Sequence, residues 1–334
     1  MHENQFAPTG APQPPVRSLR ERVGLVIDGT QAQAAVKAIV EAEAAGVRQV
    51  WSIQAPTTPD TLTTFAAAAV QTKTIRLGTA IVPTYPRHPL TLAMQVLSIY
   101  DLAPDRLRLG VGPSHKPMIE GVYGLHMTPP IEHLREYVGI LRALLWEGKI
   151  DHHSNNYNIV ASLPRTARVP ILISALRENA YQLAGEISDG AIPWLCPIPY
   201  LLKTALPALQ RGAANRNRPT PPIVAHVLAA ASSDRAAVLA ATRKQIAFYG
   251  TLPFYAHMFA DAGFPVSEQG VMSDDLVNSL VISGTEEQIA ARFKEILSQG
   301  LEELLVLPVP VSNPEQERTR LAQLIGRLDS ITGV

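Results

Sequence analysis

The chain has 334 residues, of which 46% are hydrophobic and 17% are charged, so it is long enough for one large α/β domain or two ordinary ones. Lysine plus arginine and aspartate plus glutamate both number 29, and this zero net charge excludes the basic surface typical of a nucleic-acid-binding protein. No apolar run is long enough to span a membrane, and the single cysteine, Cys196, excludes an intrachain disulfide, so we expect a cytoplasmic protein with no membrane or nucleic-acid partner.

The N-terminal segment differs in composition from the rest of the chain. Residues 1–20 are rich in proline and polar residues, which predicts a disordered tail. Residues 21–334 are expected to form a single domain, in which a short β-branched run is followed by a helical stretch about eight times. The predicted strands cover residues 23–28, 47–53, 74–82, 106–112, 169–174, 190–195, 222–231 and 303–309. These runs are continuously apolar, as in parallel strands that are covered on both faces.

Helical patterns fill the stretches between these strands. The predicted helices cover residues 31–46, 61–71, 89–104, 131–148, 178–188, 199–213, 233–250 and 285–300. The last of them begins with Thr285 and Gln288 at the spacing of a capping box, in which each side chain bonds the backbone of the other residue.

Strands and helices that alternate in this way are typical of a (β/α)8 TIM barrel. The competing fold is a doubly wound open sheet, which usually carries a GxGxxG turn after its first strand. Here the first strand continues into VIDGTQAQ, which lacks that turn, so the barrel is favoured. Two connections, about 112–130 and 248–284, are longer than the others. We expect them to be insertion segments at the C-terminal face of the strands, where they act as lids or binding loops.

Active sites of such barrels lie at the C-terminal ends of the strands, so the residues just past each strand are the candidates. They are Asp28, Gln54, Tyr85, Arg87, His88, Ser114, His115, Ala175, Leu176, Arg177 and Trp194. His115 can exchange a proton near neutral pH, although a solvated loop histidine is an equally good interpretation.

Several of these candidates have a structural alternative. Arg87 and His88, between prolines, can clamp an anion or can form the first turn of a helix that begins at Pro89. Asp28 can hydrogen-bond a cofactor or can cap the helix that starts near Gln31. Arg177 and the amides of the following helix form a possible phosphate site, or Arg177 is a surface arginine.

Other kinds of active site are excluded by missing patterns. The chain has no HxxxH or CxxC metal motif, no GxSxG after a strand and no pair of acids at strand ends. A site with so few catalytic groups indicates that a bound cofactor carries the chemistry.

Longer motifs resemble one known family. The stretch GTAIVPTYPRHPLTLAMQVLSIYDLAPDRLRLGVG (78–112) resembles the signature of the bacterial-luciferase-like superfamily, and PILISALRENAYQLAGEISDGAIPW (170–194) is similar to a later segment of it. One branch of that superfamily binds reduced FMN and activates oxygen, and the other uses coenzyme F420, a 5-deazaflavin, to move hydrides. VWSIQAPTTPDTLT (50–63) and GVGPSHKPMIEGVYG (110–124) look more similar to the F420-dependent oxidoreductases.

This resemblance implies roles for individual residues. A non-prolyl cis peptide at Ala80–Ile81, after Thr79, is expected to support the deazaflavin ring. His115 stands where several relatives carry a carboxylate that assists proton transfer, and Gln54 stands where some have a histidine. The phosphate-binding backbone of the family matches the segment from Ala175 to Arg177.

The resemblance therefore predicts an F420-dependent oxidoreductase that transfers a hydride to or from a small organic substrate.

 The alternatives are an FMN-dependent monooxygenase of the same fold and an inactive barrel that serves as a binding subunit. His115 is the expected catalytic residue, Tyr85 and Arg87 are the expected substrate contacts, and a homodimer is expected. Expected cofactor contacts are Asp28, Gln54, Thr79, Ala80, Ile81, Ser114, Ala175, Leu176, Arg177 and Trp194.

Overall fold

A parallel β-sheet forms the centre of the protein in the computed structural model, which describes residues 17–331. Its strands run in the order β11-β10-β12-β1-β2-β3-β5-β8-β9, and β4 pairs with β5. The strands are β1 (Val23–Val26), β2 (Gln49–Ser52), β3 (Arg76–Thr79), β4 (Val82–Pro83), β5 (Leu107–Gly112), β8 (Ile171–Ser174), β9 (Ala191–Ile192), β10 (Val224–Ala230), β11 (Val281–Ser283) and β12 (Glu303–Pro308). Each predicted strand therefore contains an observed one, and the predicted strand 74–82 is divided into β3 and β4.

The sheet curls, so that its two ends approach each other. On one side the ladder is continuous, with β1 between β12 and β2. On the other side the two-residue strand β9 meets the start of β10 through a single bridge, Ala191–Ile223, and Ala191 N donates to Pro222 O at 2.9 Å. The α/β fold with a curled parallel sheet is therefore confirmed, whereas a fully closed eight-stranded barrel stays a prediction.

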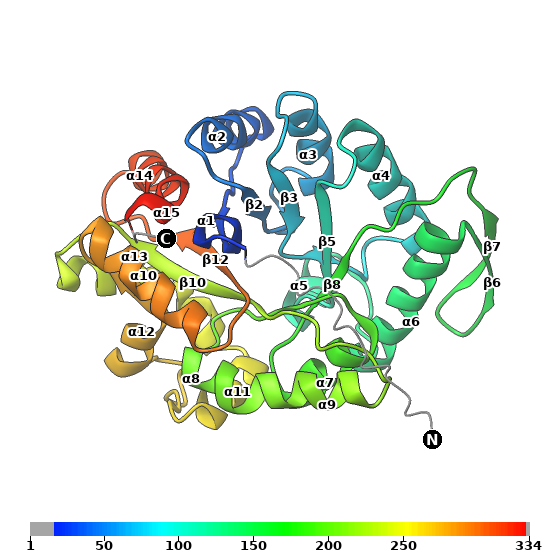
Figure 1. The fold of residues 1–334 in the computed structure, drawn as a ribbon. Helices are drawn as coiled ribbons and strands as arrows, with labels where there is room; N and C mark the ends of the chain where they lie inside the picture. The colour runs from blue at the N-terminus through cyan, green and yellow to red at the C-terminus, as the bar shows by residue number, and fades with distance from the viewer. Residues whose placement is uncertain (1–16, 332–334) are drawn as a thin grey trace, which may run out of the picture.

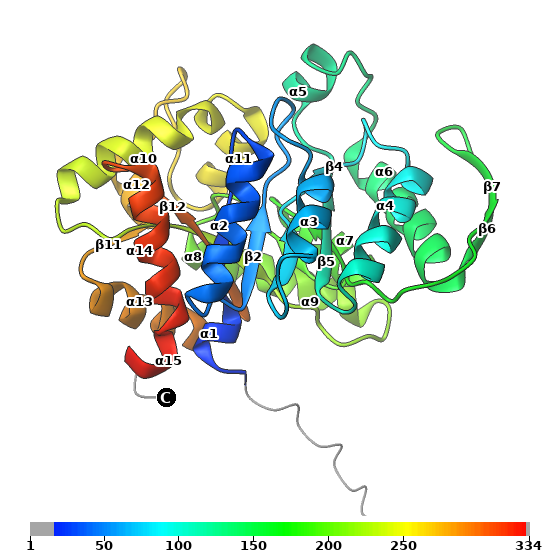
Figure 2. The same cartoon turned by 90° about the horizontal axis from the view of Figure 1, so that it is seen from above.

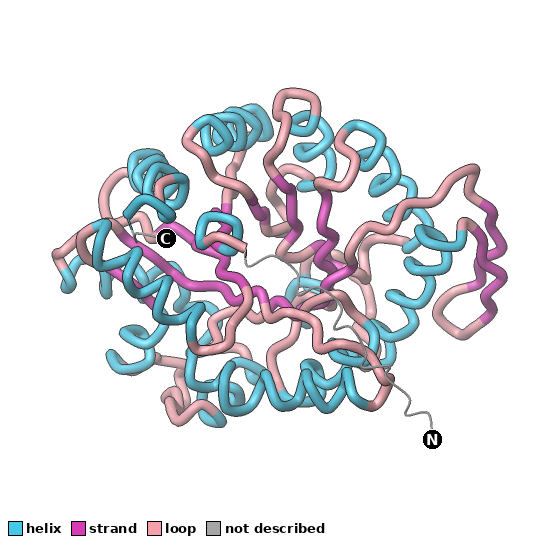
Figure 3. Tube along the Cα trace, in the orientation of Figure 1, coloured by secondary structure: helices cyan, strands magenta, loops and turns pink. Residues whose placement is uncertain are grey.

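Helices surround the sheet, as Figure 3 shows. They are α1 (Leu19–Arg22), α2 (Ala32–Ala44), α3 (Thr61–Ala69), α4 (Pro89–Leu102), α5 (Lys116–Gly121), α6 (Pro130–Arg142), α7 (Glu178–Ile187), α8 (Ile198–Tyr200), α9 (Leu206–Ala214), α10 (Arg235–Gly250), α11 (Pro253–Asp261), α12 (Asp274–Leu280), α13 (Glu286–Ser298), α14 (Pro314–Gly326) and α15 (Leu328–Ile331), with π-helical turns η1 (Ala143–Glu147) and η2 (Leu201–Ala205). The capping box predicted for Thr285 and Gln288 is present at the start of α13. Within residues 17–331, no helix has both the length and the hydrophobicity needed to cross a membrane.

Most of the predicted N-terminal tail, residues 1–20, lies outside the described residues. Residues 1–16 of that tail lie outside the described residues, whereas Arg17 to Arg20 are described and α1 begins at Leu19. Figure 2 shows α1 at one end of the molecule and α5 and α11 at the other. The short N-terminal helix therefore covers the end of the sheet opposite to the predicted site.

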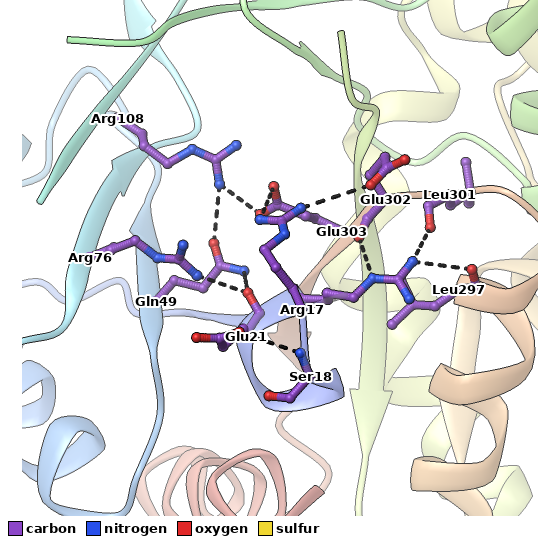
Figure 4. A network of polar contacts seen from close by, with 11 residues as sticks. Arg17, Ser18, Glu21, Gln49, Arg76, Arg108, Leu297, Leu301, Glu302 and Glu303 are labelled. Atoms are coloured by element: carbon purple, nitrogen blue, oxygen red, sulfur yellow. Dashed lines mark hydrogen bonds and ion pairs between the residues drawn. The ribbon is translucent and has the colours of Figure 1, made fainter. Parts of the chain in front are cut away.

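Polar contacts join α1 to the strands at this end (Figure 4). Glu303, at the start of β12, is 1% exposed, and its carboxylate accepts hydrogen bonds from Arg108 at 2.6 Å and from Arg17 at 3.2 Å. Gln49 and Arg76 both donate to the backbone oxygen of Glu21 in α1. Burial alone would raise the pKa of Glu303, but the charge and hydrogen bond of Arg108 hold that pKa below its usual value.

A two-stranded hairpin that was not predicted projects from the body (Figures 1 and 2). It consists of β6 (Lys149–His153) paired antiparallel with β7 (Asn158–Ser162). Glu136 of α6 accepts hydrogen bonds from His152 Nε2 at 2.8 Å, from Asn156 Nδ2 at 2.7 Å and from the Ser154 hydroxyl. One carboxylate therefore fixes the hairpin to the helix.

Replacing Glu136 by alanine is expected to loosen the hairpin. The change removes an acceptor shared by three donors, and the net contribution of a hydrogen bond to a charged group is at most about 1.5–3 kcal/mol. Amide hydrogen exchange of residues 149–162 should accelerate by at least about tenfold, as measured by mass spectrometry. Glu132→Ala, an exposed acid on the same helix, is the matched control and should leave this exchange unchanged. Equal exchange in both variants would show that Glu136 does not hold the hairpin.

Candidate active site

The segment between β3 and β4 lies at the C-terminal end of the sheet. The peptide bond between Ala80 and Ile81 is cis, as the resemblance predicts. Ala80 N donates to Ser52 O at 2.8 Å, and Ile81 O accepts from Gln54 N at 3.3 Å. The two residues are thus held against the end of β2.

Thr79 is fully buried and does not face the open end of the sheet with its side chain. Its hydroxyl donates to Gly110 O at 2.7 Å and accepts from Gly110 N at 2.8 Å. The side chain expected to contact a cofactor is therefore a link between β3 and β5.

Asp28 follows β1 and borders a cavity of about 100 Å³, which is also lined by the hydroxyl-bearing residues Ser52, Thr58, Thr61 and Thr64. Its carboxylate accepts a hydrogen bond from Ile53 N at 2.9 Å. The side chain is exposed to this cavity but closely surrounded by protein, and burial raises its pKa to about 6 against the opposing effect of the Ile53 bond. The alternative role as a helix cap does not hold, because Gln31 occupies the N-cap of α2.

Gln54 uses its side chain locally. The amide nitrogen donates to Ala55 O at 3.0 Å, and the amide oxygen accepts from Thr61 N at 2.7 Å. Both ends of the amide therefore hold the loop that leads from β2 into α3.

Tyr85 lies on the loop after β4. Its hydroxyl donates to Thr128 O at 2.7 Å, and its ring stacks on His133 with centroids 3.9 Å apart. His133 Nε2 and the Thr84 hydroxyl lie 2.8 Å apart. Tyr85 thereby connects this loop to the insertion 112–130 and to α6, so its hydroxyl already has a protein partner.

The side chains of Arg87 and His88 contact the beginnings of neighbouring helices and residues within them. Arg87 forms an ion pair with Asp60, and it donates to Gln95 Oε1 at 2.9 Å. His88 is the N-cap of α4, where its Nδ1 accepts from Leu90 N at 3.3 Å. The helix-start interpretation of His88 is therefore confirmed, and the positive charge of Arg87 is neutralised within the protein.

His115 lies in an aromatic cluster at the C-terminal end of the sheet. It follows Ser114, whose φ of 59° is in the left-handed region, and it precedes α5. The imidazole packs edge-on against Tyr249 and Tyr255, with centroid distances of 5.8 and 5.6 Å. Burial lowers the pKa of His115 to about 4, so the ring is neutral at pH 7.

Trp194 extends this cluster toward the interior of the sheet. Its ring lies edge-on to Tyr249 at 5.6 Å and to His226 of β10 at 4.8 Å. Because a carbonyl oxygen only accepts, His226 Nδ1 donates to Pro193 O at 2.7 Å, and its buried Nε2 has no protein partner. Burial lowers the pKa of His226 to about 4, so Nε2 is left as an acceptor.

Sequence reasoning did not single out His226, Tyr249 or Tyr255. His226 is the one polar residue in the apolar run 222–231, which is a signal that could have identified it. Tyr249 and Tyr255 lie in the insertion 248–284, and their ring contacts with His115 place part of that segment over the end of the sheet.

The segment from Ala175 to Arg177 leads from β8 into α7. Ala175 N donates to Ile192 O at 3.2 Å, and Leu176 O accepts from the Tyr200 hydroxyl at 3.3 Å. Arg177 is the N-cap of α7 and pairs with Asp261 of α11 at 3.1 Å. The first amides of α7 have no intrahelical acceptor and remain the anion-binding feature of this segment.

A family model described as luciferase-like monooxygenase matches residues 13–303. The chain belongs to the luciferase-like monooxygenase family. The resemblance predicted from the sequence is thus confirmed. Most members of this family are oxidoreductases or monooxygenases.

Two relatives illustrate the range of names in this family. The 5,10-methylenetetrahydromethanopterin reductase of Methanolobus tindarius is 24% identical over 306 residues, which cover 86% of this chain and 92% of that protein. The F420-dependent glucose-6-phosphate dehydrogenase of Beutenbergia cavernae is 32% identical over 183 residues, which cover 51% of this chain and 53% of that protein.

Solved structures with different cofactors share the fold. An F420-dependent secondary alcohol dehydrogenase in complex with an F420–acetone adduct superposes with a TM-score of 0.77 at 15% identity, over 93% of this chain and 98% of that chain. The oxygenating constituent of 3,6-diketocamphane monooxygenase from Pseudomonas putida, in complex with FMN, has a TM-score of 0.70 at 15% identity, over 92% and 98%. At these identities the likeness concerns the fold alone.

Proposed function

We propose that the protein is an F420-dependent oxidoreductase that transfers a hydride between the deazaflavin and a small organic substrate. The observation that carries the proposal is the aromatic cluster of His115, Trp194 and Tyr249 at the end of the sheet, which offers apolar walls and few charges. Such a site suits a flat cofactor that supplies the reactivity itself. The relatives named as F420-dependent proteins support the deazaflavin as that cofactor.

The residues present fit a flat, partly polar ring system. Ile81 and the backbone around it border one side, and Trp194 and Tyr249 offer aromatic surface. His226 Nε2 is a buried acceptor without a protein partner, which a ring N–H can satisfy. The amides at the start of α7, with Arg177, are suited to a phosphate on the cofactor tail.

The protein itself positions the substrate and excludes water. When bound, F420 supplies a two-electron carrier that gives or takes a hydride. Tyr249 and Tyr255 cover His115 and lower the local dielectric, which strengthens every polar contact at the site. Because His115 is neutral at pH 7, it can accept a proton from a substrate hydroxyl. Donating one would first require protonation, at a cost of about 4 kcal/mol for a pKa about three units below the working pH.

An FMN-dependent monooxygenase is the second candidate, because the family is described by that activity and a structure of the same fold holds FMN. The third is a barrel without chemistry. The side chain of Gln54, at a position where some relatives have a histidine, is occupied by loop contacts and does not titrate.

Binding of purified protein to F420 and to FMN, measured by isothermal titration calorimetry, separates these candidates. We expect a dissociation constant for F420 in the micromolar range or below, and binding of FMN at least about tenfold weaker. Tight binding of FMN alone would replace the proposed function by the monooxygenase. Binding of neither would favour the barrel without chemistry.

Three further properties are inferred from the sequence and from its resemblance to the family. We propose that β9 and β10 complete a closed eight-stranded barrel, that the protein forms a homodimer and that it acts in the cytoplasm. Light scattering coupled to size-exclusion chromatography measures the second of these directly, and a monomeric mass would contradict it.

A further inference from the structure

We propose that Asp28 is the acid that gives a proton to the substrate when the substrate is reduced, and the base that takes it back in the reverse reaction. This inference rests on the proposed function and assigns to it a group other than His115. It also implies a substrate class, namely small carbonyl compounds and the matching alcohols.

The carboxylate of Asp28 is open on one side. A single hydrogen bond, from Ile53 N at 2.9 Å, holds it, and the cavity of about 100 Å³ lies beside it. Among residues 17–331, no lysine, arginine or histidine forms an ion pair with it. An acid that is positioned by one backbone amide and faces a cavity can exchange a proton with a bound molecule.

Other acids near this end of the sheet are neutralised by cations. Asp60 pairs with Arg87, and Asp261 pairs with Arg177 at 3.1 Å. Glu120 lies 3.8 Å from Lys116. A paired carboxylate keeps its negative charge and is a poor proton donor. Asp28 is therefore the acid at this end whose surroundings favour the protonated form.

Asp28 is connected to both sides of the proposed site. It accepts a hydrogen bond from Ile53 N, and the backbone N of the next residue, Gln54, donates to Ile81 O at 3.3 Å. On the opposite side, burial raises the pKa of Tyr249 and the negative charge of Asp28 raises it further. Tyr249 in turn contacts His115 and Trp194. The charge of Asp28 therefore acts on a member of the aromatic cluster, and its hydrogen bond to Ile53 places it one residue from the strand end that contacts Ile81.

The pKa of Asp28 differs from the pKa values of the histidines near the site. With a pKa raised to about 6 by burial, its carboxyl group is partly protonated near neutral pH. His115 and His226, with pKa values lowered to about 4 by burial, are neutral there. Tyr249 is the remaining titratable group whose pKa responds to Asp28, and its raised pKa keeps it neutral. General acids are most effective when their pKa lies near the working pH.

In the proposed step the substrate is a ketone. The carbonyl carbon receives a hydride, with its two electrons, from the reduced deazaflavin. The π electrons of the C=O bond move to oxygen, which forms an O–H bond with the proton of Asp28. The carboxylate that remains takes a proton from water, which restores the acid form of Asp28.

The first test uses the cofactor-free protein. Because the pKa of Asp28 is raised in the folded state, the protein binds this proton more tightly when folded, and that stabilisation is lost as the pH rises through about 6. The melting temperature of the Asp28→Asn variant should therefore increase relative to wild type between pH 4 and pH 7. A constant difference over this range would overturn the proposal.

The second test follows reduction of a panel of small ketones by reduced F420 in wild type, Asp28→Asn and Asp28→Glu. We expect Asp28→Asn to lower kcat about 100-fold or more, to abolish the apparent pKa near 6 in the pH profile and to leave the F420 dissociation constant within about threefold. Asp28→Glu should restore part of the rate and the pH dependence. Asp275→Asn, an exposed acid in α12, is the control and should behave as wild type.

Two results distinguish this proposal from the proposed function. If F420 binds and ketones are reduced with an unchanged pH profile in Asp28→Asn, the role of Asp28 is overturned and the oxidoreductase stands. If F420 does not bind to the wild type, the proposed function falls and the role of Asp28 falls with it.

Discussion

Glu303→Gln is expected to lower the free energy of unfolding by about 3 kcal/mol, because it leaves the largely buried guanidinium of Arg108 without its counter-charge. Glu303 also accepts from Arg17, so the change weakens the attachment of the N-terminal segment to β12. Urea denaturation followed by circular dichroism measures the effect. Glu302→Gln is the matched control. The side chain of Glu302 is 59% exposed, and its carboxylate lies 3.9 Å from the guanidinium of Arg17. That variant should change the free energy by less than about 0.5 kcal/mol.

The same ion pair predicts a pH dependence. The pKa of Glu303 is held below the usual range of a glutamate, so the stabilisation is present above that range and is lost as the pH falls through the folded-state pKa. Wild type should therefore lose stability in this acid range, and Glu303→Gln should lose less. Equal stability of the Glu303 and Glu302 variants at pH 7 would show that the buried pair contributes little.

Gly110→Ala is expected to lower the free energy of unfolding by about 3 kcal/mol or more. An added Cβ would overlap the backbone oxygen of Thr79 and lie 2.6 Å from Ile192 Cδ1, and a backbone atom within a sheet cannot move away easily. Relief of the overlap would also disturb the paired hydrogen bonds between Thr79 and Gly110.

Gly139→Ala provides the control for this substitution. Gly139 is exposed in the middle of α6, and a Cβ added there meets no atom within 4 Å. Alanine should stabilise the helix by about 0.5–1 kcal/mol, since glycine loses more conformational freedom on folding. If both variants had the same stability, the close approach of β3 and β5 would not be as tight as the structure indicates.

The strands were predictable because parallel strands covered on both faces are continuously apolar. The cis peptide at Ala80–Ile81, where the predicted third strand is divided, was predicted from the family resemblance and not from periodicity. The hairpin formed by β6 and β7 was missed because its exposed strands carry polar residues such as His152 and His153, which give no apolar signal. Helix α14 was also missed, although Leu321 and Ile325 are fully buried on one face.

The candidate residues at the strand ends could be chosen from the sequence, but the contacts of each residue could not. Residues just past the strands were identified from topology, yet the partners of Arg87 and Tyr85, namely Asp60 and Thr128, lie far from them in sequence. A single sequence does not reveal such pairs. The pKa of Asp28 likewise depends on burial, which only the folded chain determines.

Hydrogen exchange with and without F420 tests the location of the proposed cofactor site most directly. We expect F420 to slow amide exchange in residues 79–88, 113–118 and 248–256, which border the aromatic cluster. Exchange in helix α1 should not change, because α1 lies at the opposite end of the sheet (Figure 2). Protection confined to α1 would contradict the account.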